Sequence, residues 1–184
     1  MPYPPYFAYG SNMHPLRLGE RVPSCRARGV AELPAWRLCF NKRGADHSAK
    51  CNMIHTGRPS DHVLGVVYDI AAGEKPALDR VEGGYYTATM SVMMDGGRLD
   101  VFTYLADRDM VDGALMPFDW YLEMVTCGAA HHRLPASYIQ RISESRMMMD
   151  KNPERRRGNL RRLDAMRVFS AGRRASAGAA SRQH

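Results

Sequence analysis

Residues 6–12 read YFAYGSN, which predicts a short buried strand ending in a sharp turn. An aromatic-rich run is typical of a strand, and Gly10 lets the backbone turn tightly and approach a ligand closely. The amides that follow can point together at a carboxylate or at a developing oxyanion. The same letters also fit an ordinary turn followed by a helix cap, so the segment alone leaves both interpretations open.

Outward from this segment, apolar and turn residues predict a mixture of strands and helices. Strands are expected at residues 27–33, 36–41, 63–70, 85–93 and 99–105, the last two as a hairpin around residues 95–97. Helices are expected at residues 73–81, 118–130, 136–145 and 153–168. With no repeat and no second core, the chain predicts one α+β domain over residues 1–150. A basic C-terminal extension follows over residues 151–184, helical at first and expected to be disordered from residue 171.

The composition is that of a globular protein. The 184 residues are 45% hydrophobic and 24% charged. No apolar run reaches the roughly eighteen residues that a membrane span needs. The N-terminus has neither the charged nor the apolar region of a secretory signal. The four scattered cysteines are therefore expected to be reduced thiols, and the cytoplasm is the expected compartment.

The positive charge is concentrated in the C-terminal extension. The net charge is +7; residues 151–184 hold 10 Lys and Arg against 2 Asp and Glu, whereas residues 1–150 hold 16 against 17. The folded part is thus close to neutral, and a nucleic-acid partner is expected only through the extension. A solvated, partly disordered tail is the favoured interpretation of the same charges.

Glu82 follows the helix expected to end at Val81 and precedes two glycines. A carboxylate among Val81, Tyr85 and Tyr86 could be partly desolvated, which suits a group that shuttles protons. It also fits a surface glutamate at a helix C-terminus, although the helix dipole disfavours an acidic group there.

Other candidate sites are weaker. His47, Cys51 and His55 have a spacing that could hold zinc on one helical face. Residues 45–56 fit a loop and a strand better than a helix, and no fourth ligand is apparent, so no metal site is expected. Ser11 lacks the nucleophile-elbow pattern, which argues against a serine hydrolase.

Four sequence elements occur in an order that resembles the γ-glutamylcyclotransferase family, including its γ-glutamylamine and AIG2-like relatives. They are YFAYGSNM at residues 6–13, GVVY at 65–68, LDRVEG at 78–83 followed by YY, and Tyr121 ahead of CGA at 127–129 and LPASY at 134–138. The resemblance covers roughly residues 3–146. It implies a mixed sheet closed into a small β-barrel and flanked by helices.

The resemblance also implies the residues of the site. Glu82 is implied as the catalytic carboxylate and Tyr121 as a ligand-contacting tyrosine. The implied substrate cradle consists of Tyr6, Phe7, Ala8, Tyr9, Gly10 and Ser11. The implied substrate is a small γ-glutamyl amide, cyclised to 5-oxoproline with release of the amine. No metal or organic cofactor is implied.

The chemistry of this reaction requires few protein groups. The α-amine attacks its own side-chain carbonyl, so proximity supplies much of the acceleration. One carboxylate, first base and then acid, serves both proton transfers, and the Gly10 and Ser11 amides are expected to stabilise the oxyanion. Charges at residues 42–50 either select the leaving amine or belong to a solvated loop. The main alternative is a non-catalytic protein of the same fold that binds a small carboxylate or amine.

Overall fold

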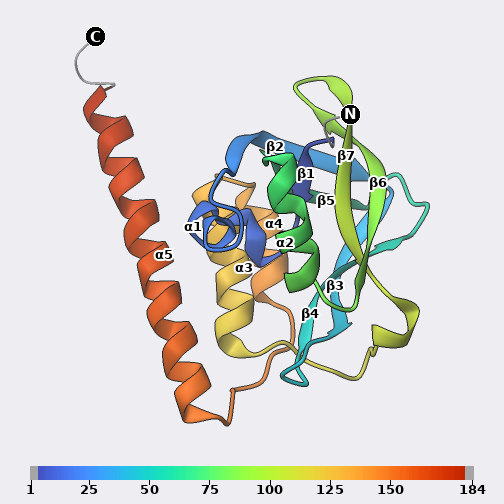
Figure 1. Cartoon of the computed structure of the whole chain (residues 1–184), viewed down its shortest axis with the longest axis vertical. Coiled ribbons are helices and arrows are strands. Elements are labelled where there is room, and N and C mark those ends of the chain that lie inside the picture. Colours follow the sequence, from blue (N-terminus) through green and yellow to red (C-terminus); the bar gives the residue numbers. More distant parts are fainter. Residues whose placement is uncertain (1–3, 181–184) are drawn as a thin grey trace.

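A closed five-stranded barrel forms the centre of the protein (Figure 1). The computed structural model describes residues 4–180, with side chains described as far as residue 173. The strands are β1 (Tyr6–Ala8), β2 (Arg26–Pro34), β3 (Trp36–Arg43), β4 (Ala49–His55), β5 (His62–Asp69), β6 (Tyr85–Met94) and β7 (Gly97–Ala106). The barrel order is β1-β5-β2-β6-β7, whereas β3 and β4 form a separate two-stranded ribbon. The expected mixed barrel is therefore confirmed.

Strand β1 closes the barrel and is buried along its whole length. It pairs antiparallel with β5 on one side and parallel with β7 on the other, so all three of its residues are shielded from solvent. A Cβ at Gly65 of β5 would lie 2.5 Å from the Ala8 carbonyl oxygen and 2.7 Å from the Phe7 ring. Glycine at this position therefore allows β1 to pack tightly against β5.

The hairpin β6–β7 has a two-residue turn. Asp95 and Gly96 both have positive φ values, 51° and 77°, and Met94 pairs directly with Gly97. Two consecutive positive φ values match the twist of the flanking strands, which is why an Asp-Gly pair favours this turn. The hairpin expected from the sequence is confirmed, with a turn one residue shorter than expected.

Five α-helices and three short 3₁₀ turns pack around the strands in the described part of the chain. The helices are α1 (Pro15–Gly19), α2 (Lys75–Val81), α3 (Asp119–His131), α4 (Ala136–Ser143) and α5 (Pro153–Ala180). The 3₁₀ turns are η1 (Ser11–Met13), η2 (Ala72–Glu74) and η3 (Arg108–Met110). None of the helices within residues 4–180 combines the length and the apolar character that a bilayer crossing requires.

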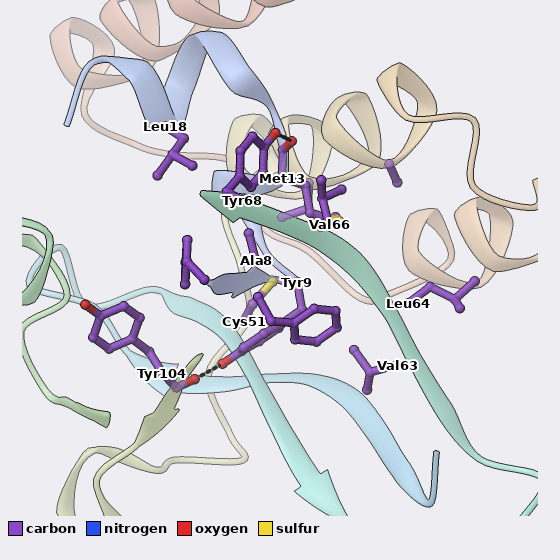
Figure 2. Close-up of a cluster of buried hydrophobic side chains, with 14 of the residues drawn as sticks. Ala8, Tyr9, Met13, Leu18, Cys51, Val63, Leu64, Val66, Tyr68 and Tyr104 are labelled. Carbon is purple, nitrogen blue, oxygen red and sulfur yellow. Dashed lines mark hydrogen bonds between the residues drawn. The ribbon is translucent and has the colours of Figure 1, made fainter. Parts of the chain in front are cut away.

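Hydrogen bonds from buried tyrosines connect the barrel to the segment that follows β1 (Figure 2). The Tyr68 hydroxyl on β5 donates to the Met13 carbonyl oxygen at 2.6 Å, and the Tyr9 hydroxyl donates to the Tyr104 carbonyl oxygen. Because both hydroxyls are satisfied, the rings can be buried without leaving an unpaired polar group. These contacts fix the backbone on both sides of the turn at Gly10.

Helix α5 corrects two expectations about the C-terminal extension. It runs along one side of the domain (Figure 1) and packs on α3 and α1. Leu163 and Met166 are completely buried in the same core as the barrel residues, so this part of the extension is not a solvated tail. The helix also continues beyond Val168 to Ala180, further than the sequence predicts. Residues 181–184 lie outside the described residues.

Candidate active site

A cavity of about 460 Å³ lies where the turn after β1, the C-terminal end of α2, the loop between β3 and β4, and α3 meet. Its volume is within the usual range for a small-molecule site. The predicted site residues that line it are Tyr6, Tyr9, Gly10, Ser11, Glu82 and Tyr121. Phe7 and Ala8 do not line it, because both are completely buried in the core. Substrate contact by those two residues therefore stays a prediction.

Gly10 allows other parts of the protein to approach the turn. Its φ of −115° is accessible to any residue, so no left-handed backbone explains the glycine. A Cβ at Gly10 would instead lie 3.0 Å from the Cβ of Cys51 and 3.6 Å from the Tyr121 hydroxyl. Within residues 4–180, the amides of Gly10 and Ser11 donate no hydrogen bond to another residue. Both residues line the cavity, so each brings an unused backbone donor to its wall.

Glu82 directs its carboxylate into the cavity from the end of α2. Its Oε1 atom accepts hydrogen bonds from Asn12 Nδ2 at 2.9 Å and from Arg21 Nη1 at 3.0 Å. The side chain is 15% exposed, so the predicted partial desolvation is confirmed, but the ion pair with Arg21 was not predicted. The hydrogen bonds from Asn12 and Arg21 hold one oxygen of the Glu82 carboxylate in a defined position in the cavity.

Asn12 joins the turn to this carboxylate. Its Nδ2 also donates to the Tyr6 hydroxyl at 3.1 Å, and its Oδ1 accepts from Arg21 Nη1 at 2.8 Å. Asn12, Arg21 and Glu82 therefore form a closed set of hydrogen bonds that fixes the Glu82 carboxylate. Asn12 was part of the YFAYGSN segment, but its contact with Glu82 depends on tertiary structure.

Two tyrosine hydroxyls hold the backbone of β4 at the cavity wall. The Cys51 amide donates to the Tyr121 hydroxyl at 3.1 Å, and the Tyr85 hydroxyl donates to the Cys51 carbonyl oxygen at 2.7 Å. Burial raises the pKa of both tyrosines, so both stay neutral at physiological pH. Tyr121 thus lines the cavity and also positions the strand opposite Gly10.

Several cationic residues of the cavity wall were not predicted as individual site residues. Those that line the cavity are Arg17, Arg21, Lys42, Lys50 and Arg80. Of the charged residues in the segment 42–50, Lys42, Asp46 and Lys50 all line the cavity. Arg17 lies in α1 and Arg21 in the turn that follows it, and no local sequence signal indicated that both would line the cavity.

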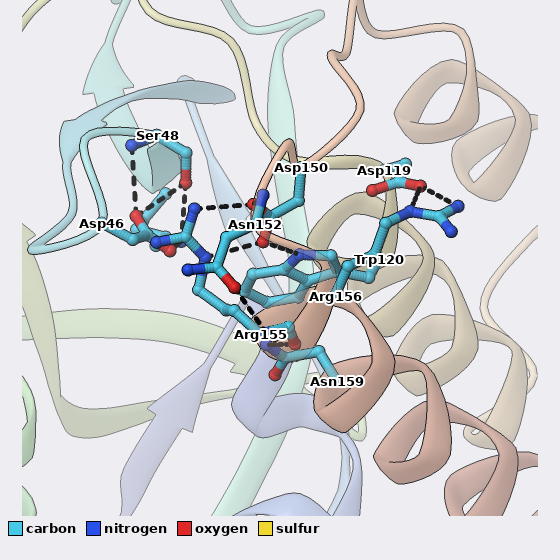
Figure 3. A network of polar contacts seen from close by, with 10 residues as sticks. Asp46, Ser48, Asp119, Trp120, Asp150, Asn152, Arg155, Arg156 and Asn159 are labelled. Atoms are coloured by element: carbon cyan, nitrogen blue, oxygen red, sulfur yellow. Dashed lines mark hydrogen bonds and ion pairs between the residues drawn. The ribbon is translucent and has the colours of Figure 1, made fainter.

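The start of α5 is anchored beside this wall (Figure 3). Arg155 forms two hydrogen bonds with the buried carboxylate of Asp150, which also accepts from Trp120 Nε1 at 3.0 Å. These hydrogen bonds hold the pKa of Asp150 well below its usual range, and those from Arg155 have the largest effect. Because Trp120 lines the cavity, the network fixes part of the wall as well as the helix.

The three residues considered as zinc ligands, His47, Cys51 and His55, have different surroundings. Cys51 belongs to the cavity wall, whereas His47 is exposed in the loop before β4 and His55 packs on Trp36 at the end of that strand. No group of three or more His, Cys, Asp and Glu side chains in the described part of the chain is arranged to hold a metal ion.

Comparison with known proteins gives consistent results. The model of the AIG2-like family matches residues 62–142. A γ-glutamylcyclotransferase from Bos taurus is 30% identical over 148 residues, which cover 75% of this chain and 76% of that protein. The Homo sapiens γ-glutamylcyclotransferase is 29% identical over 145 residues, covering 74% and 76%.

Solved structures show the same fold. A structure described as a γ-glutamyl cyclotransferase superposes with a TM-score of 0.73 at 24% identity, covering 81% of this chain and 91% of that one. An uncharacterised Homo sapiens protein superposes with a TM-score of 0.71 at 25% identity, covering 82% and 95%.

Proposed function

Because the chain belongs to the γ-glutamylcyclotransferase and AIG2-like superfamily, we propose that it is a γ-glutamyl cyclotransferase. In this reaction the α-amine of a γ-glutamyl amide attacks the side-chain carbonyl carbon. The bond to the leaving nitrogen then breaks, and the products are 5-oxoproline and a free amine or amino acid.

The observation that carries the proposal is the hydrogen bond between Asn12 and Glu82. It joins the turn after β1, which offers backbone amides, to a carboxylate inside one cavity. These are the two kinds of group that the reaction needs: a proton acceptor for the attacking amine and donors for the oxyanion.

Glu82 is assigned both proton transfers. As a carboxylate it accepts a proton from the α-ammonium group, which makes the amine nucleophilic. It then donates a proton to the leaving nitrogen as the carbon–nitrogen bond breaks. Arg21 and Asn12 hold the carboxylate in place during both steps.

The Gly10 and Ser11 amides are assigned the developing oxyanion. A preorganised pair of donors stabilises the tetrahedral intermediate more than the planar amide, and this difference lowers the barrier. The attack is intramolecular, so the cavity needs to hold the substrate in a folded conformation and needs no covalent enzyme intermediate.

The test is direct. Purified protein is incubated with a panel of γ-glutamyl amides, and 5-oxoproline is measured by mass spectrometry. Release of 5-oxoproline from at least one compound, abolished in Glu82→Gln, is the expected result. If the protein binds these compounds but releases no 5-oxoproline, it is a non-catalytic member of the fold and the proposed activity is wrong.

A further inference from the structure

Lys42 is a buried lysine near the end of β3 that contacts the segment carrying Glu82. The residue is 5% exposed, and its Nζ atom donates to the Gly83 carbonyl oxygen at 2.6 Å. The same atom lies 4.6 Å from the centre of the Tyr85 ring. Burial lowers the pKa of Lys42, and the negative charge of Glu82 acts against this effect. Burying an ammonium group costs free energy unless the group is hydrogen-bonded, so the bond to Gly83 offsets part of this cost.

A β-bulge in the ribbon lies directly before Lys42. Phe40 pairs with Cys51, whereas Lys42 pairs with Lys50, so β3 has one extra residue at this point. Bulges change the direction in which nearby side chains point, and they are frequent beside active sites. The side chain that follows the bulge is the one that reaches the backbone after α2. The contact with Gly83 therefore depends on a local feature of the ribbon.

The chain leaves helical geometry at Glu82, one residue before the Lys42 contact. Glu82 is the C-terminal cap of α2, with a φ of −85° and a ψ of 38°, and its carbonyl oxygen accepts from the Tyr85 amide at 3.1 Å. The last carbonyl groups of a helix lack donors within the helix. Lys42 supplies a donor to Gly83 from 41 positions away in the sequence. The backbone directly after Glu82 is thus held by a side chain from another element.

Gly84 lets the Lys42 side chain lie against this backbone. Its φ is 78°, a conformation that favours glycine. A Cβ at Gly84 would lie 3.1 Å from both Cε and Nζ of Lys42 and 2.8 Å from Cε of Met110. Lys42 is therefore packed on residues 83 and 84 and does not extend into solvent.

The position of the Glu82 carboxylate depends on both ends of its side chain. At the carboxylate end, Oε1 accepts from Asn12 and Arg21, and Oε2 accepts no hydrogen bond from a residue in the range 4–180. At the backbone end, Lys42 holds the segment that follows. A displacement of about 1 Å at a catalytic group can cost about a hundredfold in rate. Loss of the Lys42 contact is thus expected to affect catalysis as well as stability.

We propose that Lys42 is a positioning residue for Glu82. Through the Gly83 carbonyl group it fixes the backbone after Glu82, and so it directs the carboxylate toward the substrate. Lys42 itself transfers no proton. This assignment rests on the proposed function, because it concerns the residue to which both proton transfers are assigned. A lysine that only stabilised the C-terminal end of α2 would change the stability of the protein and leave its kinetics unchanged.

The first test is Lys42→Met, which keeps an unbranched side chain and removes the donor and the charge. The kcat for 5-oxoproline release is expected to fall by about tenfold, and KM to change by less than about twofold, because the carboxylate is displaced while the groups that bind substrate remain. Wild-type kcat in the folded variant overturns the proposal, and so does an effect confined to KM.

A matched control is Arg37→Met, which removes an exposed cation from the same strand outside the cavity and should keep the wild-type kcat. Thermal unfolding of each variant reports whether it folds. If Lys42→Met does not fold, Lys42→Gln, which keeps a polar tip but is shorter, is measured in its place and judged by the same outcomes.

A double-mutant cycle distinguishes positioning from a general structural effect. Because Lys42 acts through Glu82, adding Lys42→Met to Glu82→Gln is expected to change the residual rate by less than about twofold. Independent effects would multiply, and the rate would fall by about a further tenfold. That multiplication overturns the proposal.

A crystal structure of Lys42→Met separates this proposal from the proposed activity, because it requires no turnover. The Glu82 carboxylate is expected to lose its hydrogen bond with Asn12 or with Arg21. A displaced carboxylate supports the positioning role even if the wild-type protein forms no 5-oxoproline from any γ-glutamyl amide. A carboxylate in its wild-type position overturns the role whatever the activity assay shows.

Discussion

Asn12 Nδ2 lies 2.9 Å from Glu82 Oε1, although 70 positions separate the two residues in the sequence. The turn after β1 and the end of α2 therefore line the same cavity. Neither segment has a clear function alone, because one fits an ordinary turn and the other an ordinary helix end. Their contact gives both segments a role in one cavity.

Glu82→Gln is expected to lower kcat for 5-oxoproline release by about a hundredfold to ten-thousandfold. Glutamine keeps an oxygen that can accept from Asn12 and Arg21, so the fold should be preserved while proton transfer is lost. Mass spectrometry measures the rate, and Glu32→Gln, an exposed change on β2, serves as the control. Turnover at the wild-type rate would remove Glu82 from the mechanism.

Gly10→Ala is expected to lower the free energy of unfolding by about 1–3 kcal/mol, because the new methyl group would lie 3.0 Å from the Cβ of Cys51. Urea denaturation measures the loss. Gly158→Ala in α5 has open space around the added methyl and should stabilise the helix by about 0.5–1 kcal/mol. If both variants are equally stable, the proposed contact with β4 does not explain the glycine.

Leu163→Ala is expected to lower the free energy of unfolding by about 2–5 kcal/mol, and Met166→Ala by a similar amount, because both side chains are completely buried under α5. Val168→Ala, at a side chain that is 73% exposed, should change it by less than about 0.5 kcal/mol. Equal effects at all three positions in denaturant titrations would mean that α5 does not pack on the domain in solution.

Acid is expected to destabilise the protein through buried histidines between α3, η1 and α5. Burial lowers the pKa values of His14 and His132 from 6.5 to about 4, and the neighbouring His131 adds to this effect. The unfolded chain therefore binds more protons between these values. The free energy of unfolding should be constant above about pH 7 and decrease as the pH falls to about 4.

His14 is expected to contribute on the order of 3 kcal/mol to the decrease in the free energy of unfolding at acid pH. Denaturant titrations at several pH values measure the slope, and His14→Gln should reduce it because glutamine does not titrate. The cluster also includes Ser170 Oγ, 3.0 Å from His14 Nε2, and Arg173, 3.2 Å from His131 Nε2. A variant with the wild-type slope would show that the acid effect arises elsewhere.

Local sequence patterns predicted most elements of the barrel because the patterns themselves are local. The β-branched run in β5 and the Asp-Gly pair between β6 and β7 specify a strand and a tight turn without reference to the rest of the chain. The ion pair of Arg21 with Glu82 spans 61 positions and depends on tertiary structure, so no local pattern could predict it.

The C-terminal extension shows how composition can conceal a periodic signal. Its many Arg, Ala and Gly residues suggested a solvated tail. Leu163, Met166 and Ser170 are nevertheless spaced three and four apart, and all three are buried on one face of α5. This spacing, rather than the composition, indicates that the helix packs on the domain.

The separation of the β3–β4 ribbon from the barrel has an evolutionary consequence. The ribbon supplies Lys42, Cys51 and Lys50 to the cavity but shares no backbone ladder with the barrel strands. Its sequence can therefore diverge while the turn after β1 and Glu82 stay in register with each other. We expect that grafting this hairpin between relatives, with Lys42 kept, changes this wall of the cavity and leaves the hydrogen bond between Asn12 and Glu82 in place.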